Sequence, residues 1–181
     1  MTNNKKVLQF VADCQAFATP DKVVWIDGSD AQRDALRAEA VATGEIIKLN
    51  QELLPDCYYH RTAENDVARV EDRTFICSRK EEDAMPHSIV KWKDPKEAYA
   101  MVNEIAKGAY AGRTMYVIPY SMGVVGSPFS KIGIEITDSI YVVLNMMIMT
   151  RVGKMCLDQL GVDGDFVKGF HAKCDVNPEK R

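Results

Sequence analysis

The chain has 181 residues, of which 46% are hydrophobic, and its 23 basic and 26 acidic side chains give a formal net charge of −3. This length and composition predict one soluble globular domain with a sizeable core, and the charge balance excludes the basic footprint of a protein that binds nucleic acid or anionic membranes. Five widely spaced cysteines without a Cys-x-x-Cys pair are typical of reduced, mostly buried thiols, and no signal core follows the amino terminus, so we expect a cytoplasmic location.

The first sixty residues carry alternating helix and strand signals. Apolar side chains recur at helical spacing before Pro20, and an Asp-Gly turn precedes the capping residues Ser29 and Asp30. We expect, in order, a helix over residues 7–17, a strand over 23–26, a helix over 30–44 and a strand over 46–49. These elements predict a β-α-β unit whose turn has one glycine, which favours ordinary fold construction over a dinucleotide site.

The middle of the chain is more polar and is interrupted by prolines. Its signals predict an extended segment over 57–60, a short helical turn that starts at Asn65 or Asp66 and contains Arg69, a strand over 74–77 and extended backbone over 88–92. Asp94 as N-cap and Pro95 at the first helical position then begin a helix that ends near Gly108.

The last third predicts two strands, over 114–118 and 132–136, joined by a connection rich in glycine, proline and serine. Alternating isoleucines in the second strand indicate one buried face. Asp138 or Ser139 caps a following helix over 141–151, which is apolar around most of its circumference and far shorter than the roughly 20 residues of a membrane span, so we expect it to be buried under the sheet. A second helix over 155–160 ends at Gly161, and the remainder is irregular. Together the signals predict a mixed α/β fold, with a mixed β-sheet packed with helices, as a single domain over residues 1–181.

The stretch 112–133 is a first candidate for function, because loops that mix stiff prolines with permissive glycines often position a functional group. It lacks the Gly-Lys-Ser/Thr ending of a P-loop, so a structural connection between core strands is the alternative to phosphate binding. Cys57 and His60 form only half of a zinc signature, and no Gly-x-Ser-x-Gly elbow occurs. The residues by themselves support neither a metal site nor covalent catalysis.

Arg69 is the charged residue best suited to ligand binding. Its planar guanidinium can hold a carboxylate or a phosphate through two hydrogen bonds, although pairing with a neighbouring acid such as Asp66 or Glu71 is the plainer interpretation. Lys131 leaves the same choice between a ligand contact and a solvated lysine at the end of a strand.

Longer stretches resemble the amino-terminal region of the GTP-dependent phosphoenolpyruvate carboxykinases. The resemblance includes GRTMYVIPYSMGVVGSPFSKIG at 112–133, IEITDS at 134–139, residues 146–153, DVARVEDRT at 66–74 and, more loosely, VWIDGS at 24–29. It implies the amino-terminal lobe of the carboxykinase fold, in an enzyme of gluconeogenesis that decarboxylates oxaloacetate and phosphorylates the enolate from GTP to give phosphoenolpyruvate. It also implies that Arg69 binds the carboxylate or phosphoryl group of that substrate, and that the complete enzyme uses GTP and manganese.

The family's substrate loop, phosphate loop, manganese ligands and guanine pocket lie beyond the matched residues. We therefore expect a substrate-side domain, as a fragment or truncated product, without the nucleotide- and metal-binding carboxy-terminal domain, with no cofactor of its own and no activity alone.

Two alternatives remain open. The first is that the chain is a non-catalytic docking or regulatory module that associates with a catalytic lobe through its apolar surface. The second is that it is part of a carboxykinase with another phosphoryl donor, such as pyrophosphate. Val124 and Ile140 where the family commonly has proline, and Met147 in place of an arginine, leave details of the loop and the helix surface open.

Overall fold

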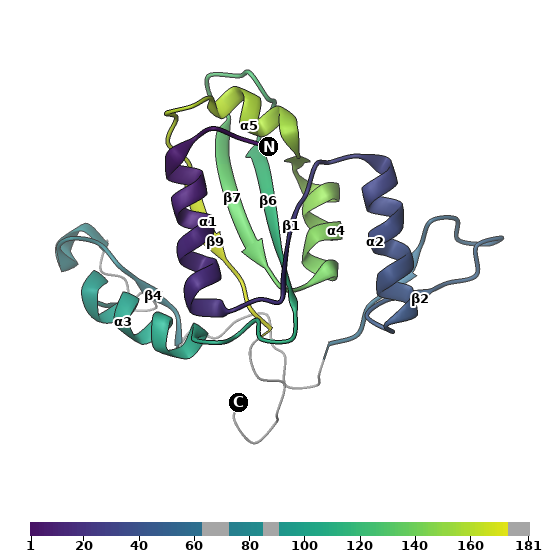
Figure 1. The fold of residues 1–181 in the computed structure, drawn as a ribbon, viewed down its shortest axis with the longest axis horizontal. Coiled ribbons are helices and arrows are strands. Elements are labelled where there is room, and N and C mark those ends of the chain that lie inside the picture. The colour runs from purple at the N-terminus through teal and green to yellow at the C-terminus, as the bar shows by residue number, and fades with distance from the viewer. Residues whose placement is uncertain (63–72, 85–90, 174–181) are drawn as a thin grey trace. The chain divides into compact units, whose positions relative to one another are not determined.

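The computed structural model describes residues 1–62, 73–84 and 91–173 of the chain. The chain divides into two compact units: unit 1 comprises Met1–His60 and Gly108–Arg181, and unit 2 comprises Arg61–Lys107. The main β-sheet and both hydrophobic clusters belong to unit 1 (Figure 1).

Unit 1 combines a sheet with helices, which confirms the predicted mixed α/β class. Its helices are α1 (Lys5–Ala18), α2 (Asp30–Ala42), α4 (Ile140–Met149) and α5 (Lys154–Leu160). Its strands are β1 (Lys22–Trp25), β2 (Ile47–Lys48), β3 (Tyr58–Tyr59), β6 (Thr114–Met122), β7 (Lys131–Thr137), β8 (Arg151–Val152) and β9 (Val167–Phe170). In Figure 1, β6 and β7 lie between α1 and α4.

The main sheet has the strand order β1-β6-β7-β9, and β8 also pairs with β6. β6 is parallel to β1 and antiparallel to β7, whereas β7 and β9 are parallel. This mixture of directions brings the start of β6 and the ends of β7 and β9 to one edge of the sheet. The predicted mixed sheet is therefore confirmed, and the edge it creates carries the polar groups described below.

Two hydrophobic clusters, one on each face of the sheet, form the core of unit 1. The first joins α1 and α5 to the side chains of Ile132, Ile134 and Ile136, so the alternation in β7 does mark one buried face. The second joins α2 and α4 to Tyr116 and Ile118 of β6. Each cluster removes apolar surface from water, which is the main favourable term in folding.

Side-chain caps fix where the helices of unit 1 begin. Ser29 and Ser139 accept backbone N–H bonds from the first turns of α2 and α4, as their positions in the sequence predict, and Asn4 does the same for α1. The buried Asn4 amide also donates to the carbonyl oxygens of Gly161 and Gly164, at 3.2 and 3.1 Å. One side chain therefore both starts α1 and holds the segment that follows α5.

The predicted β-α-β unit is wrong. β2 pairs antiparallel with β3 in a separate two-stranded sheet and does not enter the main sheet beside β1. The neighbour of β1 is β6, which lies almost ninety positions later in the chain. Local pattern identified both strands but could not identify their partners, because pairing is decided by long-range contacts.

The expectation that the apolar helix after β7 is buried under the sheet holds for only one side of α4. Ile140, Val143 and Leu144 of α4 are buried, but Ile148 and Met149 are 76% and 66% exposed. In the last turn, Met146 and Met147 still pack against the second cluster, whereas Ile148 and Met149 do not. Of the helices in the described ranges, none is long and apolar enough to cross a membrane.

Two further expectations need correction. Residues after 162 were expected to be irregular, yet β9 pairs along β7. Among the four described cysteines, Cys14 and Cys156 are buried but Cys57 and Cys77 are exposed, so the prediction of mostly buried thiols is wrong for this part of the chain.

β6 continues through Pro119 to Met122, beyond its predicted end at residue 118. A proline lacks the N–H that a strand interior needs. One side of β6 pairs with β1 up to Val117 and with β8 from Tyr120. The backbone N and O of Pro119 point to this side, so Pro119 lies in the gap between the two partner strands. Only its carbonyl oxygen is used there, as acceptor for Gly153 N at 2.9 Å.

Unit 2 contains α3 (Pro95–Ala106), the 3-10 turn η2 (Glu81–Ala84) and the parallel pair β4 (Phe75–Ile76) with β5 (Lys91–Trp92). Asp94 caps α3 and Pro95 opens it, as predicted. The Trp92 indole N–H donates to Ser78 O at 3.1 Å, which ties the turn after β4 to β5. The predicted helical turn around Asn65 and Asp66 lies outside the described residues.

Candidate functional site

Arg69, the predicted substrate-binding residue, also lies outside the described residues. The described chain reaches residue 62 on one side of it and resumes at Arg73 on the other. The geometry that bears on a site is therefore that of the residues that hold the chain before this segment. These residues belong to unit 1, at the edge of the sheet where β6 starts and β7 and β9 end.

A polar cluster occupies this edge, and we call it the edge cluster. Its members lie between α2 and β2, before β6, at and after the end of β7, and after β9. They are Glu45, Arg113, Thr137, Asp138, Ser139, His171 and Lys173. Parallel β7 and β9 end side by side, and antiparallel β6 starts next to them, so the sheet topology itself gathers these residues.

The Asp138 carboxylate is the buried centre of the edge cluster. Its side chain is 0% exposed, one oxygen lies 2.6 Å from Arg113 Nη1, and the other accepts Lys173 N at 2.9 Å. A buried charge is tolerated only when it is paired and hydrogen-bonded, and both conditions are met here. Asp138 therefore joins the start of β6, the end of β7 and the segment after β9.

Thr137 and His171 make the second link in the edge cluster. Thr137 Oγ1 shares a hydrogen bond of 2.8 Å with His171 Nδ1 and accepts Ser139 N at 3.1 Å. The phenol of Tyr110 donates to the carbonyl oxygen of His171. His171 is thus fixed through both its ring and its backbone, which suits a structural histidine better than a proton shuttle.

Glu45 connects the edge cluster to the start of α4. One carboxylate oxygen accepts Ser139 Oγ at 2.9 Å and Tyr141 N at 2.9 Å, and it lies 3.2 Å from Lys173 Nζ. Burial raises the pKa of the Glu45 carboxyl, but these hydrogen bonds and the lysine charge outweigh burial and lower the pKa below its ordinary value. A carboxylate with this many donors stabilises the fold in its charged form.

His60 attaches to the same place. Its Nδ1 lies 2.6 Å from the carbonyl oxygen of Glu45 and therefore donates, and its ring stacks on Tyr141 with centroids 3.8 Å apart and planes 17° apart. His60 and Lys173 each lie within two residues of the end of a described stretch. Glu45 thus anchors both His60 and the chain that follows β9.

The edge cluster can position backbone but is poorly suited to act as a nucleophile or base, because its carboxylates and histidines already have partners. Among the described residues, no group of three or more His, Cys, Asp or Glu side chains could hold a metal ion. Cys57 and His60 accordingly find no further ligand in this part of the chain.

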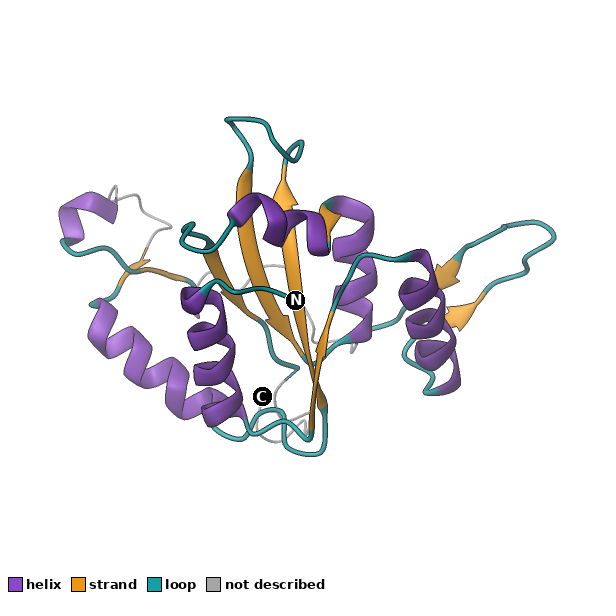
Figure 2. Cartoon of the chain, turned by 45° about the horizontal axis from the view of Figure 1, so that its top comes forward, coloured by secondary structure: helices purple, strands orange, loops and turns teal. Residues whose placement is uncertain are grey.

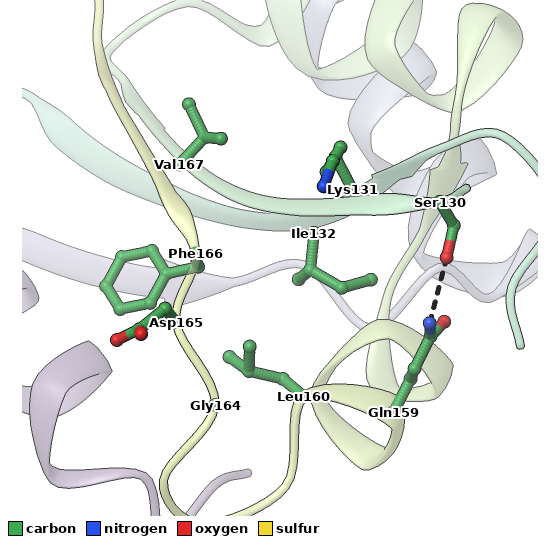
Figure 3. A pocket seen from close by; sticks show the side chains of 9 residues that line it. All are labelled: Ser130, Lys131, Ile132, Gln159, Leu160, Gly164, Asp165, Phe166 and Val167. Carbon is green, nitrogen blue, oxygen red and sulfur yellow. Dashed lines mark hydrogen bonds between the residues drawn. The ribbon is translucent and has the colours of Figure 1, made fainter. Parts of the chain in front are cut away.

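A cavity of about 480 Å³ lies at the opposite edge of the sheet, where β7 and β9 begin (Figure 3). Ile132, Leu160 and Phe166 give it an apolar lining. Gln159 bridges to Ser130 Oγ and Gly126 N, both at 2.9 Å, so this amide is already engaged. Lys131 is exposed at the first position of β7, in agreement with a solvated lysine.

The connection between β6 and β7 is short, spanning residues 123–130, and projects beyond the strands in Figure 2. Its backbone bonds to itself, with Ser127 N donating to Val124 O and Ser130 N to Ser127 O. Internal bonding of this kind favours the structural connection over a phosphate-binding loop. No sequence pattern indicates the role of Glu45, because its partners Ser139 and Tyr141 are 94 and 96 residues away.

Comparisons with known proteins identify the family, which the geometry of the site does not. Residues 9–181 match the family model described as phosphoenolpyruvate carboxykinase N-terminal domain. The chain is 48% identical over 180 residues to the phosphoenolpyruvate carboxykinase [GTP] of Anaeromyxobacter sp. (strain K), and 49% identical over 171 residues to the protein of that name from Corynebacterium kroppenstedtii. These alignments cover 99% and 94% of this chain but only 30% and 27% of the relatives. The chain thus spans less than a third of the length of these relatives.

Proposed function

We propose a function from one premise: the chain belongs to the GTP-dependent phosphoenolpyruvate carboxykinase family and corresponds to its amino-terminal domain. Both units, over residues 1–181, then form one substrate-side domain of an enzyme that converts oxaloacetate and GTP into phosphoenolpyruvate, carbon dioxide and GDP. The observation that carries this proposal is the match to the family over residues 9–181, which includes the arginine segment 66–74.

In this proposal Arg69 binds the carboxylate or phosphoryl group of the three-carbon substrate. A guanidinium can hold either group through two parallel hydrogen bonds and can spread the charge that develops during phosphoryl transfer. Its precise placement would matter, since misplacing a binding group by about 1 Å can cost about 100-fold in rate.

GTP and manganese would be bound by the part of the enzyme that this chain does not match. The names of the relatives favour GTP over pyrophosphate as phosphoryl donor. A bound divalent metal would neutralise charge on the phosphates, and the described residues offer no set of ligands for it. The 181-residue chain alone would then bind no cofactor and have no turnover, and its place of action would be the cytoplasm.

A chimera tests the proposal. This chain replaces the matched part of the Anaeromyxobacter sp. (strain K) relative, and GTP-dependent formation of phosphoenolpyruvate from oxaloacetate is measured. We expect activity in the chimera. Replacing Arg69→Ala in it removes a charged, two-bond contact of about 1.5–3 kcal/mol, which lowers kcat/KM for oxaloacetate by about 10- to 150-fold.

The affinity of the chimera for GTP should change little with Arg69→Ala, and Arg69→Lys should restore activity only in part, because lysine cannot form the planar fork. A loss of GTP affinity with unchanged use of oxaloacetate would remove the substrate role of Arg69. An inactive but folded chimera would contradict the assignment as the substrate-side domain.

A docking or regulatory module is the second candidate function. It is favoured by large apolar side chains exposed on unit 1, of which Phe129 is 89%, Ile148 76% and Met149 66% exposed. In this role the chain would associate with a separate catalytic lobe without contributing to the reaction. Activity of the chimera that depends on Arg69 would exclude it.

A further inference from the structure

Glu135 lies on the face of the sheet opposite α1. Ile134 and Ile136 point into the first cluster, so Glu135 between them points to the other face. The strand register places Gly169 of β9 beside Glu135, and Tyr120 of β6 beside Gly133. Tyr120 and Glu135 therefore share one face. Tyr120 packs against the second cluster, whereas Glu135 belongs to neither cluster.

Both side chains lie flat on the sheet because glycines make room for them. A Cβ added at Gly169 would lie 1.8 Å from Glu135 Oε2, and one added at Gly133 would lie 2.4 Å from Tyr120 Cζ. No real side chain fits at these distances. The two glycines thus let a carboxylate and a phenol lie down against the backbone.

Among the described residues, neither the Glu135 carboxylate nor the Tyr120 hydroxyl has a hydrogen-bond or ion-pair partner. Burial raises the pKa of Glu135, with no cation to oppose it, and burial followed by the charge of Glu135 raises the pKa of Tyr120. Glu45 gives the contrast within the same unit, since three donors lower its pKa despite burial. An unpaired, partly buried carboxylate weakens a fold, and such residues are kept where function needs them.

We propose that Glu135 and Tyr120 form a recognition site for a basic side chain, arginine or lysine, carried by the part of a carboxykinase that this chain does not match. A guanidinium above the sheet would pair with the carboxylate, hydrogen-bond the phenol oxygen and contact the face of the aromatic ring. The occupant follows from charge complementarity and from the relatives, since about 70% of the length of the Anaeromyxobacter protein lies outside the alignment. This inference rests on the proposed function, because it uses the same complementary part.

The test is the change in melting temperature caused by Glu135→Gln, measured in the 181-residue chain and in the chimera described above. Gln keeps the shape but removes the charge. In the chain alone we expect a higher melting temperature, by about 2–4 °C for each 1 kcal/mol gained. In the chimera we expect a lower one, because the basic partner loses its counter-charge. Tyr120→Phe, which removes only the hydroxyl, should lower the melting temperature of the chimera by less and leave the chain alone nearly unchanged.

Glu52→Gln is the matched control, because Glu52 is exposed in a loop, and it should change neither protein. A shift of the same sign in the chain and the chimera would overturn the proposal. So would a self-association of the chain that Glu135→Gln abolishes, since it would make a second copy the occupant. The melting temperature can be measured without activity. If Glu135→Gln shifts it in opposite directions in the chain and in an inactive chimera, the site is upheld and the proposed function is rejected. If the shifts have the same sign and the chimera is active, the proposed function is upheld and the site is rejected.

Discussion

Asp138 joins three parts of unit 1 through one carboxylate that is shielded from water. The Lys154–Asp158 pair on α5 has the same shortest distance of 2.6 Å, but its side chains are 66% and 59% exposed. Distance alone would rank these two ion pairs equally. Burial separates them, because an exposed pair is screened by water while a buried charge that loses its partner keeps its desolvation cost.

We predict that Asp138→Asn lowers the free energy of unfolding by about 3 kcal/mol, near the lower end for a broken buried pair because Arg113 is partly exposed. Asp158→Asn, the matched control, should change it by less than about 0.5 kcal/mol. Urea denaturation of the chain with each substitution measures both values. Equal losses in the two variants would show that burial does not set the strength of these pairs.

Glu45 and Glu135 should give opposite pH dependence. The pKa of Glu45 is lowered in the fold, so its contribution to stability is present above the unfolded value of about 4.5 and is lost as pH falls through the folded pKa. The pKa of Glu135 is raised, so its contribution is largest below the unfolded value and is lost as pH rises through the folded pKa. Neither effect requires the other residue, since they lie at different parts of the sheet.

Melting temperatures measured between pH 3 and pH 7 test these two predicted pH dependences. Relative to the unchanged chain, Glu45→Gln should cost stability mainly at the upper end of this range and little at the lower end. Glu135→Gln should add stability at the upper end and nothing at the lower. Parallel curves for the two variants would contradict the assigned directions.

For the helices and strands, local sequence signals predict where a helix starts better than they predict which strands pair. Ser29, Asp94 and Ser139 mark helix starts because a cap acts within a few residues of itself, and the isoleucine alternation of β7 marks its buried face for the same reason. β9 escaped prediction because Val-Lys-Gly-Phe has weak strand character and is held in place by β7. The role of Glu45 is not predicted because nothing near it in the sequence indicates its distant partners.

Gly28 and Gly153 show how tightly two elements meet. A Cβ at Gly28 would lie 2.1 Å from Val152 O, and one at Gly153 would lie 2.0 Å from Asp27 O. The turn after β1 therefore packs backbone against backbone on the junction between β8 and α5. The sequence resemblance included residues 24–29 and 146–153 as separate stretches, and the structure brings them together.

Gly28→Ala should destabilise the chain by about 1–3 kcal/mol more than Gly126→Ala, the extra cost being that of overpacking. Both glycines have positive φ, +82° and +87°, so both substitutions bear the strain of about 1–2 kcal/mol that a left-handed residue costs. Only Gly28 also lacks space, since nothing lies within 4 Å of a Cβ at Gly126. Chemical denaturation compares them, and equal losses would mean that the contact with Val152 yields without cost.

For the molecule as a whole, the sequence predicts the fold class and the family. In the proposed function, the groups that bind GTP and the metal belong to the part of the relatives that this chain does not match. The proposed role of Arg69 rests on the family match over residues 9–181. The electrostatic part of phosphoryl transfer needs a metal and a phosphate cradle. A domain that supplies one wall of a site can therefore be well folded, recognisable and catalytically silent.

The chain alone is predicted to have no catalytic activity. The purified 181-residue chain, given oxaloacetate, GTP and manganese, should form no phosphoenolpyruvate above the uncatalysed rate, while the chimera under the same conditions should turn over. Direct detection of phosphoenolpyruvate and GDP by phosphorus NMR distinguishes true transfer from spontaneous decarboxylation of oxaloacetate, which yields pyruvate and leaves GTP intact. GDP and phosphoenolpyruvate formed in equal amounts by the chain alone would require a nucleotide and metal site within these residues.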